Sequence, residues 1–140
     1  MIVVDTMMIA QLVVRGDATD EALAVRAIDA EWAAPALWRS ELRNVLATLV
    51  RAGDLELALA LRSMAAAERA MGGRSWAVGS SSILELAAAS GCTAYDCEFV
   101  ALAVAHAVPL VTRDRQVLGA FPTVARTPTD YVNARRRVSG

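Results

Sequence analysis

The stretch Met1-Ile2-Val3-Val4-Asp5-Thr6 opens the chain and decides how the rest is interpreted. Its residues 2–4 form a short apolar, β-branched run, which is typical of a buried strand. The strand ends at Asp5, and the residues from Thr6 to about Val14 have a helical pattern. A buried strand that passes directly into a helix begins a βαβ unit, so the opening predicts a parallel sheet.

The alternation of strand and helix continues along the chain. Further short strands are expected at residues 32–34, 76–78 and 110–112 and near Val124. Helices are expected at residues 19–30, 37–52, 55–70, 80–89 and 93–107, with a short one from Arg115. Polar side chains are expected to cap several of them, namely Asp17 or Thr19, the serines at 80–82, and Thr93. The pattern predicts an α/β fold with a mostly parallel central sheet.

A chain of 140 residues is long enough for one domain with a substantial core and too short for two. We therefore expect a single domain over residues 1–140, in which roughly the last eight residues form a flexible tail that contains Arg135-Arg136-Arg137. No apolar run approaches the roughly 20 residues that cross a bilayer. No signal peptide is visible, so we expect a cytoplasmic protein without a membrane partner.

Composition excludes several kinds of chemistry. All 14 cationic residues are arginines, and the formal net charge of −1 does not by itself point to a nucleic-acid partner. Without lysine there is no Walker A loop and no Schiff base. The one histidine, His106, is expected to be buried with its polar atoms satisfied, and Cys92 and Cys97 are expected to be core residues rather than zinc ligands or a disulfide. Carboxylates and hydroxyls remain for catalysis.

Two aspartates come directly after predicted strands. Asp5 follows the strand at 2–4, and Asp114 follows the strand at 110–112. Each of them could simply cap the next helix. If the two strands are parallel neighbours, however, both side chains emerge at the carboxyl edge of the sheet, where α/β proteins bind their ligands.

A third aspartate lies on a predicted helix. Asp96 aligns with Phe99 and Val100 on the apolar face of that helix, so its carboxylate is expected to point inward. An inward carboxylate needs a partner or a metal ion, unless it completes a capping box with Thr93. Glu98 is two positions further on and faces another side, so we leave it out of the site.

The fourth carboxylate is Glu41, at the border of the apolar stripe of its helix, where a surface ion pair with an arginine is the alternative role. Several carboxylates in one pocket repel one another unless a hard cation neutralises them. Mg²⁺ and Mn²⁺ prefer oxygen ligands, and such an ion can activate water and stabilise charge on a phosphoryl group. Together the four carboxylates indicate metal-assisted hydrolysis of phosphodiesters.

Four short segments also resemble the acidic motifs of a known family, in the family's order. They are Val3–Thr6, Trp38–Leu46, Thr93–Asp96 with Phe99–Ala103, and Leu110–Asp114. The third is the most specific of the four. On these segments the chain resembles PIN-domain ribonucleases, and in particular the VapC toxins of type II toxin–antitoxin systems, over essentially its whole length. One departure is Met7, where many relatives carry a small hydroxyl residue.

The resemblance implies a three-layer α/β/α sandwich, often dimeric, that cuts RNA with Mg²⁺, or with Mn²⁺ in its place. It implies that the catalytic and metal-binding residues are Asp5, Glu41, Asp96 and Asp114. The hydroxyls of Thr6 and Thr112 would orient carboxylates or water. It also implies a partner antitoxin, similar to VapB, that covers the acidic groove.

An acidic pocket needs arginines at its rim to bind RNA phosphates. The candidates next to the four carboxylates in sequence are Arg39, Arg43, Arg113 and Arg115. Other functions remain open, namely a PIN nuclease of RNA processing or DNA cleavage outside toxin–antitoxin systems, and a catalytically silent PIN binding module. A receiver domain would need a lysine, and a haloacid-dehalogenase-like phosphatase would need a second aspartate in place of Met7.

Overall fold

Five short parallel strands form the centre of the computed structural model, which describes residues 1–140. Their order in the sheet is β3-β2-β1-β4-β5. They span β1 Ile2–Val4, β2 Trp32–Pro35, β3 Ser75–Trp76, β4 Leu110–Val111 and β5 Ala125–Arg126. All five predicted strands are therefore present, with small shifts at β3 and β5, and the sheet is parallel throughout.

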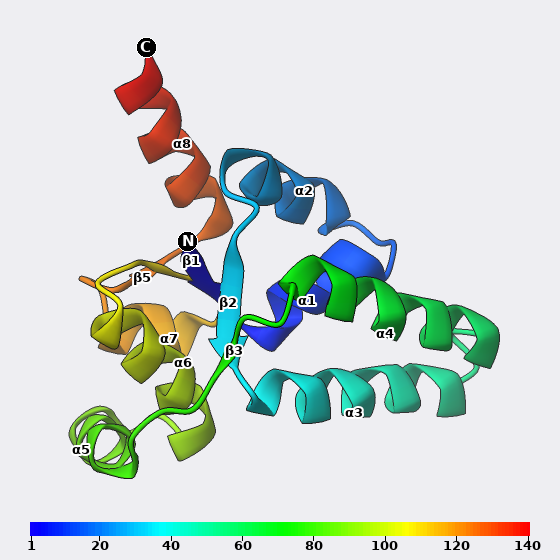
Figure 1. Ribbon diagram of the computed structural model, residues 1–140, viewed down its shortest axis with the longest axis horizontal. Helices are drawn as coiled ribbons and strands as arrows, with labels where there is room; N and C mark the ends of the chain where they lie inside the picture. The colour runs from blue at the N-terminus through cyan, green and yellow to red at the C-terminus, as the bar shows by residue number, and fades with distance from the viewer.

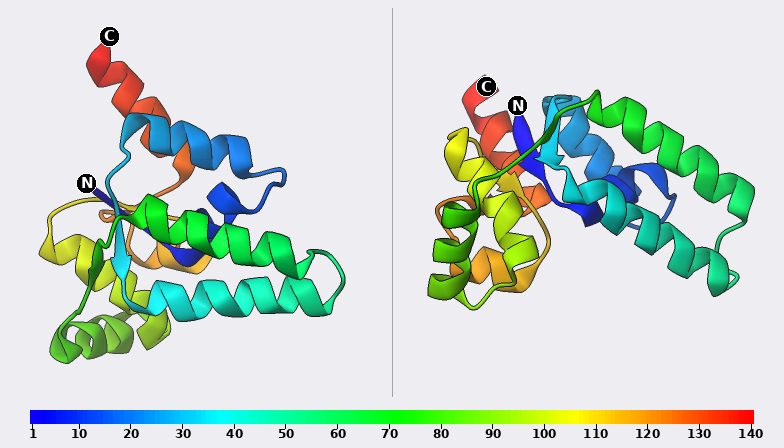
Figure 2. Two further views of the ribbon diagram at one scale, coloured as in Figure 1. Left: turned by 45° about the vertical axis from the view of Figure 1, so that its right-hand side comes forward. Right: turned by 60° about the horizontal axis from the view of Figure 1, so that its bottom comes forward.

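Eight helices surround the sheet and complete a three-layer α/β/α sandwich (Figure 1). They span α1 Thr6–Val13, α2 Thr19–Ile28, α3 Leu37–Arg51, α4 Leu57–Met71, α5 Ser80–Ser90, α6 Ala94–Ala105, α7 Arg115–Ala120 and α8 Pro128–Ser139. Helix α6 packs on β1, β2 and β4 with α5 outside it, while α1, α2 and α4 lie on the other side of the sheet. Helices α3 and α4 form a hairpin that extends from the body (Figure 2).

The core lies between these layers. Every residue of β1 and β2 is buried, as the apolar runs predicted. Cys92 and Cys97 are free and buried, which confirms their expected place in the core. His106 differs from expectation, because it is only half-buried and its ring contacts the edge of Trp76, with 4.6 Å between the ring centroids. No helix is long and apolar enough to cross a membrane.

The structure confirms one of the predicted helix caps and contradicts the other two. Thr93 caps α6, because its hydroxyl accepts the N–H of Asp96 at 3.0 Å. Helix α2 has no side-chain cap, and the Thr19 hydroxyl instead accepts the N–H of Gly16. Helix α5 follows Gly79, again without a side-chain cap. The predicted caps at Asp17 or Thr19 and at the serines 80–82 were therefore wrong.

The C-terminal residues form a helix where a flexible tail was expected. Helix α8 continues to Ser139, and its first turn is built like a helix start, with Pro128 at the first position and the Thr127 hydroxyl accepting the N–H of Asp130. Tyr131 and Val132 are buried, and α8 packs against α2. Only the last turns, residues 133–140, are fully on the surface.

Candidate active site

The strand order reverses between β1 and β4. From β1 the chain builds outward to β2 and β3, and then returns to the other side of β1 for β4 and β5. Ligands of open parallel sheets bind at such a switch point, outside the carboxyl ends of the strands. The register pairs Val4 with Val111, so Asp5 and Thr112 lie level with each other across the switch point.

A cleft of about 110 Å³ opens at this position, and all four predicted carboxylates line it. They come from four separate segments, the end of β1, helix α3, helix α6 and the end of β4. Asp5, Glu41, Asp96 and Asp114 share the cleft with the hydroxyls of Thr6 and Thr112. No arginine or histidine lines it. The fold thus brings together residues that are spread over more than a hundred positions of the sequence.

Asp5 is held by one hydrogen bond at each carboxylate oxygen. Its Oδ1 accepts the backbone N–H of Met8 at 3.0 Å, which caps α1. Its Oδ2 accepts the hydroxyl of Thr112. Asp5 therefore caps α1 and also lines the cleft at the carboxyl edge of the sheet, so the cap does not exclude a role in the site.

Two further carboxylates are oriented by neighbours. The Thr6 hydroxyl, which is buried, donates to Oε1 of Glu41 at 2.9 Å and so ties α3 to the start of α1. Oδ1 of Asp114 accepts the N–H groups of Gln116 and Val117 at the start of α7, which leaves Oδ2 without a partner in the protein. Thr6 and Thr112 thus occupy the orienting positions that the resemblance implied.

Asp96 is less constrained than the other three. Its backbone N–H binds the Thr93 hydroxyl, but its carboxylate makes no hydrogen bond or ion pair within the protein. It lines the cleft and is partly buried. In a capping box, the Asp96 carboxylate would accept a hydrogen bond from the backbone N–H of Thr93. The structure contains no such bond.

The environment disfavours negative charge at Asp5. Burial raises the pKa of Asp5 above its ordinary value, and the charges of Asp114 and Glu41 raise it further. Hydrogen bonds from Thr112 and from the Met8 N–H act in the opposite direction without cancelling the effect of burial. A carboxylate that is costly to ionise among other carboxylates gains most from a nearby cation.

Glu98, which we left out of the site on sequence grounds, has a raised pKa. Burial raises the pKa of Glu98, and the charge of Glu41 raises it further. Glu98 does not line the cleft, but it lies close enough to Glu41 for the two charges to interact. The approach of α3 to α6 creates this proximity, and helical periodicity within α6 contains no signal for it.

The donor chemistry of the cleft fits a hard divalent cation. Every candidate ligand is a carboxylate or hydroxyl oxygen, and Glu41, Asp96 and Asp114 each keep at least one carboxylate oxygen without a partner in the protein. No three of these groups converge tightly enough to form a ready-made metal site. Mg²⁺ and Mn²⁺ prefer oxygen ligands and keep several waters when bound, so the chemistry of the donor set is the kind that these ions use.

Among the four predicted RNA-binding arginines, Arg39 is already engaged. Its guanidinium donates to Oγ of Ser75 at 2.8 Å and lies 4.9 Å from the ring centroid of Trp38. Its Nε lies 3.8 Å from Glu68. These contacts join α3 to β3 and α4, so Arg39 stabilises the fold in addition to, or in place of, any contact with RNA.

The other three arginines are exposed. Arg113 follows β4, lies beside Asp5 and Asp114 in a hollow next to the cleft, and has its side chain half-exposed, 3.5 Å from Glu21. Arg43 is on α3 in a groove against α4, away from the carboxylates, and Arg115 is in the first turn of α7. Arg113 is therefore the arginine best placed beside the cleft.

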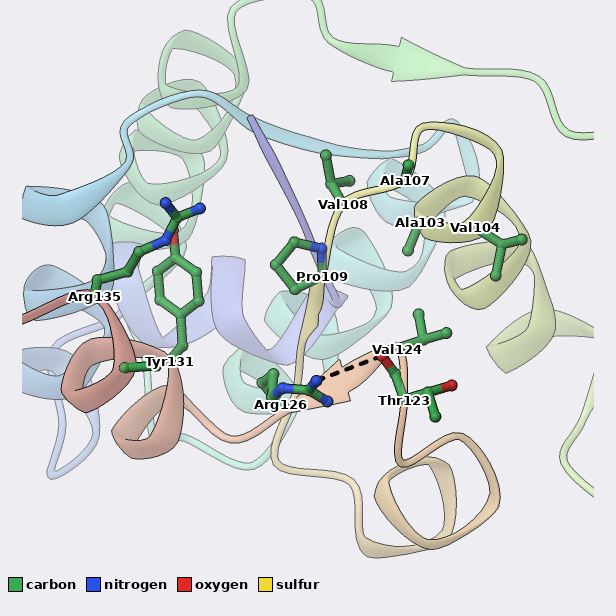
Figure 3. A pocket seen from close by; sticks show the side chains of 11 residues that line it. Ala103, Val104, Ala107, Val108, Pro109, Thr123, Val124, Arg126, Tyr131 and Arg135 are labelled. Carbon is green, nitrogen blue, oxygen red and sulfur yellow. Dashed lines mark hydrogen bonds between the residues drawn. The ribbon is translucent and has the colours of Figure 1, made fainter. Parts of the chain in front are cut away.

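A larger cleft of about 490 Å³ lies near the amino ends of β4 and β5, between α6 and α8 (Figure 3). Its lining is mostly apolar and contains no carboxylate. Arg126 donates there to the carbonyls of Pro122 and Ala125, and Arg135 lies over the ring of Tyr131. It holds none of the carboxylates found in the smaller cleft at the opposite edge of the sheet.

The sequence matches no protein-family model and no curated protein. Its fold is similar to that in the crystal structure of PAE2754 from Pyrobaculum aerophilum, with a TM-score of 0.75. The superposition covers 96% of each chain, and the sequences are 21% identical. At that identity the similarity establishes a shared fold over nearly the whole of both chains.

Proposed function

We propose that this protein is a Mg²⁺-dependent endoribonuclease of the PIN-domain type and the toxin of a toxin–antitoxin pair. The observation that carries the nuclease proposal is the convergence of Asp5, Glu41, Asp96 and Asp114 at the switch point of a parallel sheet. The four sequence motifs that resemble the PIN family place the same four residues in the catalytic role. Nuclease activity is the chemistry that an oxygen-only, lysine-free site of this kind supports best.

The residues of the cleft would have different roles in such a site. Asp5 at the end of β1 and Asp96 on α6 line the same cleft, and they would hold a divalent cation together with Glu41 and Asp114. A cation held there supplies a Lewis acid that polarises a phosphate oxygen and lowers the pKa of a bound water. Thr112 and Thr6 fix the rotamers of Asp5 and Glu41, so the carboxylates need little reorganisation when substrate binds.

A cleavage assay tests the nuclease proposal directly. Purified protein should cut RNA in Mg²⁺ or Mn²⁺ and stop when EDTA is added. Asp96→Asn should abolish cleavage and leave the fold intact, because the Asp96 carboxylate makes no hydrogen bond within the protein. Asp54→Asn, at an exposed position away from the cleft, is the matched control. Cleavage that persists in EDTA, or equal behaviour of the two variants, would contradict the proposal. DNA as a parallel substrate decides the preference for RNA.

The toxin proposal adds a cognate antitoxin and a homodimer. An active intracellular ribonuclease harms its own cell unless a partner inhibits it, and the resemblance to VapC implies a VapB-like partner encoded by a neighbouring gene. Expression of this chain alone in bacteria should arrest growth, and co-expression of the neighbour should restore it. Harmless expression of an RNA-cleaving protein would remove the toxin role and favour a PIN nuclease of RNA processing.

A further inference from the structure

Met7 forms a ridge between three adjoining hollows. It is the second residue of α1, and 50% of its side chain is exposed. It lines the carboxylate cleft and two neighbouring hollows. The first, here called the arginine hollow, measures about 290 Å³ and is lined by Asp5, Met7, Met8, Gln11, Arg113 and Asp114. The second, here called the asparagine hollow, measures about 340 Å³ and is lined by Thr6, Met7, Ser40, Glu41, Asn44 and Val45.

The arginine hollow has the chemistry of a phosphate site. Arg113 is the one cation among the residues that line the cleft and both hollows. Its ion pair with Glu21 spans 3.5 Å at a half-exposed position, where such pairs are weak and readily exchanged. The planar guanidinium can therefore turn to a phosphate of the bound strand and bind it through two N–H groups.

The asparagine hollow has different chemistry. Ser40 and Asn44 are one turn apart on α3 and both are exposed. The backbone carbonyl of Asn44 accepts the Thr48 hydroxyl, but its side-chain amide and the Ser40 hydroxyl make no hydrogen bond in the protein. An amide offers a donor and an acceptor side by side, which matches the edge of a nucleobase. Val45 adds an apolar surface for the ring.

We propose that the two hollows are nucleotide subsites on either side of the cleavage position and that Met7 wedges between the adjoining bases. This proposal rests on the ribonuclease function proposed above and specifies its substrate class. The flexible thioether of methionine makes favourable contacts with aromatic rings, so it can take the place of a neighbouring base in the stack. A base inside a duplex is stacked and paired, so the substrate must be single-stranded where it is cut.

Removal of single bases from the substrate tests this inference. An unstructured RNA with a mapped cleavage site is prepared in forms that lack the base on one side or the other of that site. Wild-type kcat/KM should fall by about 10-fold or more for one of these forms, the size of a lost stacking contact. Met7→Ala and Asn44→Leu should cut intact RNA about 2- to 10-fold more slowly and lose most of this sensitivity to the missing base. The same sequence placed in a duplex should resist cleavage.

Leu84→Ala is the control, because Leu84 is 64% exposed on α5, away from the cleft. It should behave as wild type with every substrate. A second readout needs no cleavage: the fluorescence of 2-aminopurine beside the cleavage position should rise when the wild type binds, because Met7 separates it from the neighbouring base, and should rise less with Met7→Ala. If removal of a base lowers kcat/KM for Met7→Ala as much as for the wild type, Met7 does not act as a wedge, and the nuclease proposal still stands. If no RNA is cut, the nuclease proposal is wrong. If 2-aminopurine fluorescence also stays unchanged when the protein is added, the subsites are wrong as well.

Discussion

The hydroxyl of Thr112 donates a hydrogen bond to Oδ2 of Asp5 and so joins the ends of β4 and β1, which are 107 residues apart in the chain. The same hydroxyl oxygen accepts the backbone N–H of Asp114 at 3.0 Å. One buried atom thus sets the position of two carboxylates of the cleft. We therefore expect the spacing between Asp5 and Asp114 to depend on this hydroxyl.

Thr112→Val tests that dependence, because valine keeps the shape of threonine and removes only the hydroxyl. We expect kcat for RNA cleavage to fall by about 10-fold or more, the cost of a hydrogen bond lost from a charged group. The Thr112 bond lowers the pKa of Asp5, so its loss should move the acid limb of the pH–rate profile to higher pH. Thr48→Val, at an exposed position on α3, should leave the profile unchanged. An unshifted acid limb in Thr112→Val would contradict this account.

Asp5→Asn should make the protein inactive and, without divalent ions, more stable at neutral pH. Burial raises the pKa of Asp5 above its ordinary value of 3.8, so the folded state favours the protonated acid. Its contribution to stability is fully present below pH 3.8 and is lost as the pH rises through the raised folded-state pKa. Asparagine has no charge to bury and still caps α1 well, so the variant avoids this loss.

Urea unfolding of both proteins in EDTA, from acid to neutral pH, measures the effect. The difference in unfolding free energy between variant and wild type should grow in favour of Asp5→Asn as the pH rises through this window. Added Mg²⁺ should stabilise the wild type and stabilise the variant less, because only binding to the folded state shifts the equilibrium. A wild type that remains the more stable protein at pH 7 in EDTA would show that the charge is not costly.

The parts of this architecture that are encoded locally could be predicted from the sequence. The apolar run before Asp5 predicted β1, and a parallel sheet then required Asp5 and Asp114 to meet at one edge. The periodicity of α6 predicted that Asp96 turns inward. The missed helix α8 also had a local signal, because Thr127 and Pro128 form an ordinary helix start.

Other features depend on how distant elements pack, and no local pattern encodes them. The charge of Glu41 raises the pKa of Glu98 only because α6 and α3 approach each other. Arg39 looks like a free cation beside Glu41 in the sequence, but β3 brings Ser75 within 2.8 Å of it. Met7 stands out in the sequence only as a departure from the family pattern, and the three hollows that it lines become visible only in the structure.

Arg113→Ala and Arg39→Ala should affect different properties, RNA binding in the first variant and stability in the second. Loss of Arg113 should weaken RNA binding and reduce the slope of log Kd against log salt by about one phosphate contact, with little change in stability. Loss of Arg39 should lower the unfolding midpoint, because it removes the Ser75 hydrogen bond and the contact with the Trp38 ring. Its salt slope should stay close to that of the wild type. Salt titrations of RNA binding and thermal melts on the same preparations separate the two, and an unchanged slope for Arg113→Ala would exclude its phosphate contact.

The α3–α4 hairpin carries a second surface where we expect the antitoxin to bind, in addition to the acidic groove that the resemblance implies it covers. Leu57 and Leu61, one turn apart on α4, are 62% and 64% exposed, which is costly unless a partner covers them. They line a groove of about 320 Å³ together with apolar residues of α3, and Arg43 and Arg51 lie in the same lining. An amphipathic helix with acidic residues on its flanks would match both the apolar groove and these two cations.

Leu61→Glu should therefore weaken antitoxin binding by about 30-fold or more, as expected for a central interface residue, and leave RNA cleavage unchanged. Leu84→Glu is the matched control, because Leu84 has the same 64% exposure but lies on α5. Titration calorimetry with the product of the neighbouring gene measures binding, and growth on co-expression reports inhibition. If Leu84→Glu breaks the complex and Leu61→Glu does not, the partner covers the other layer of the sandwich. An intact complex with both variants would place it on neither helix, and the exposed leucines of α4 would then be left for a contact between two copies of this chain.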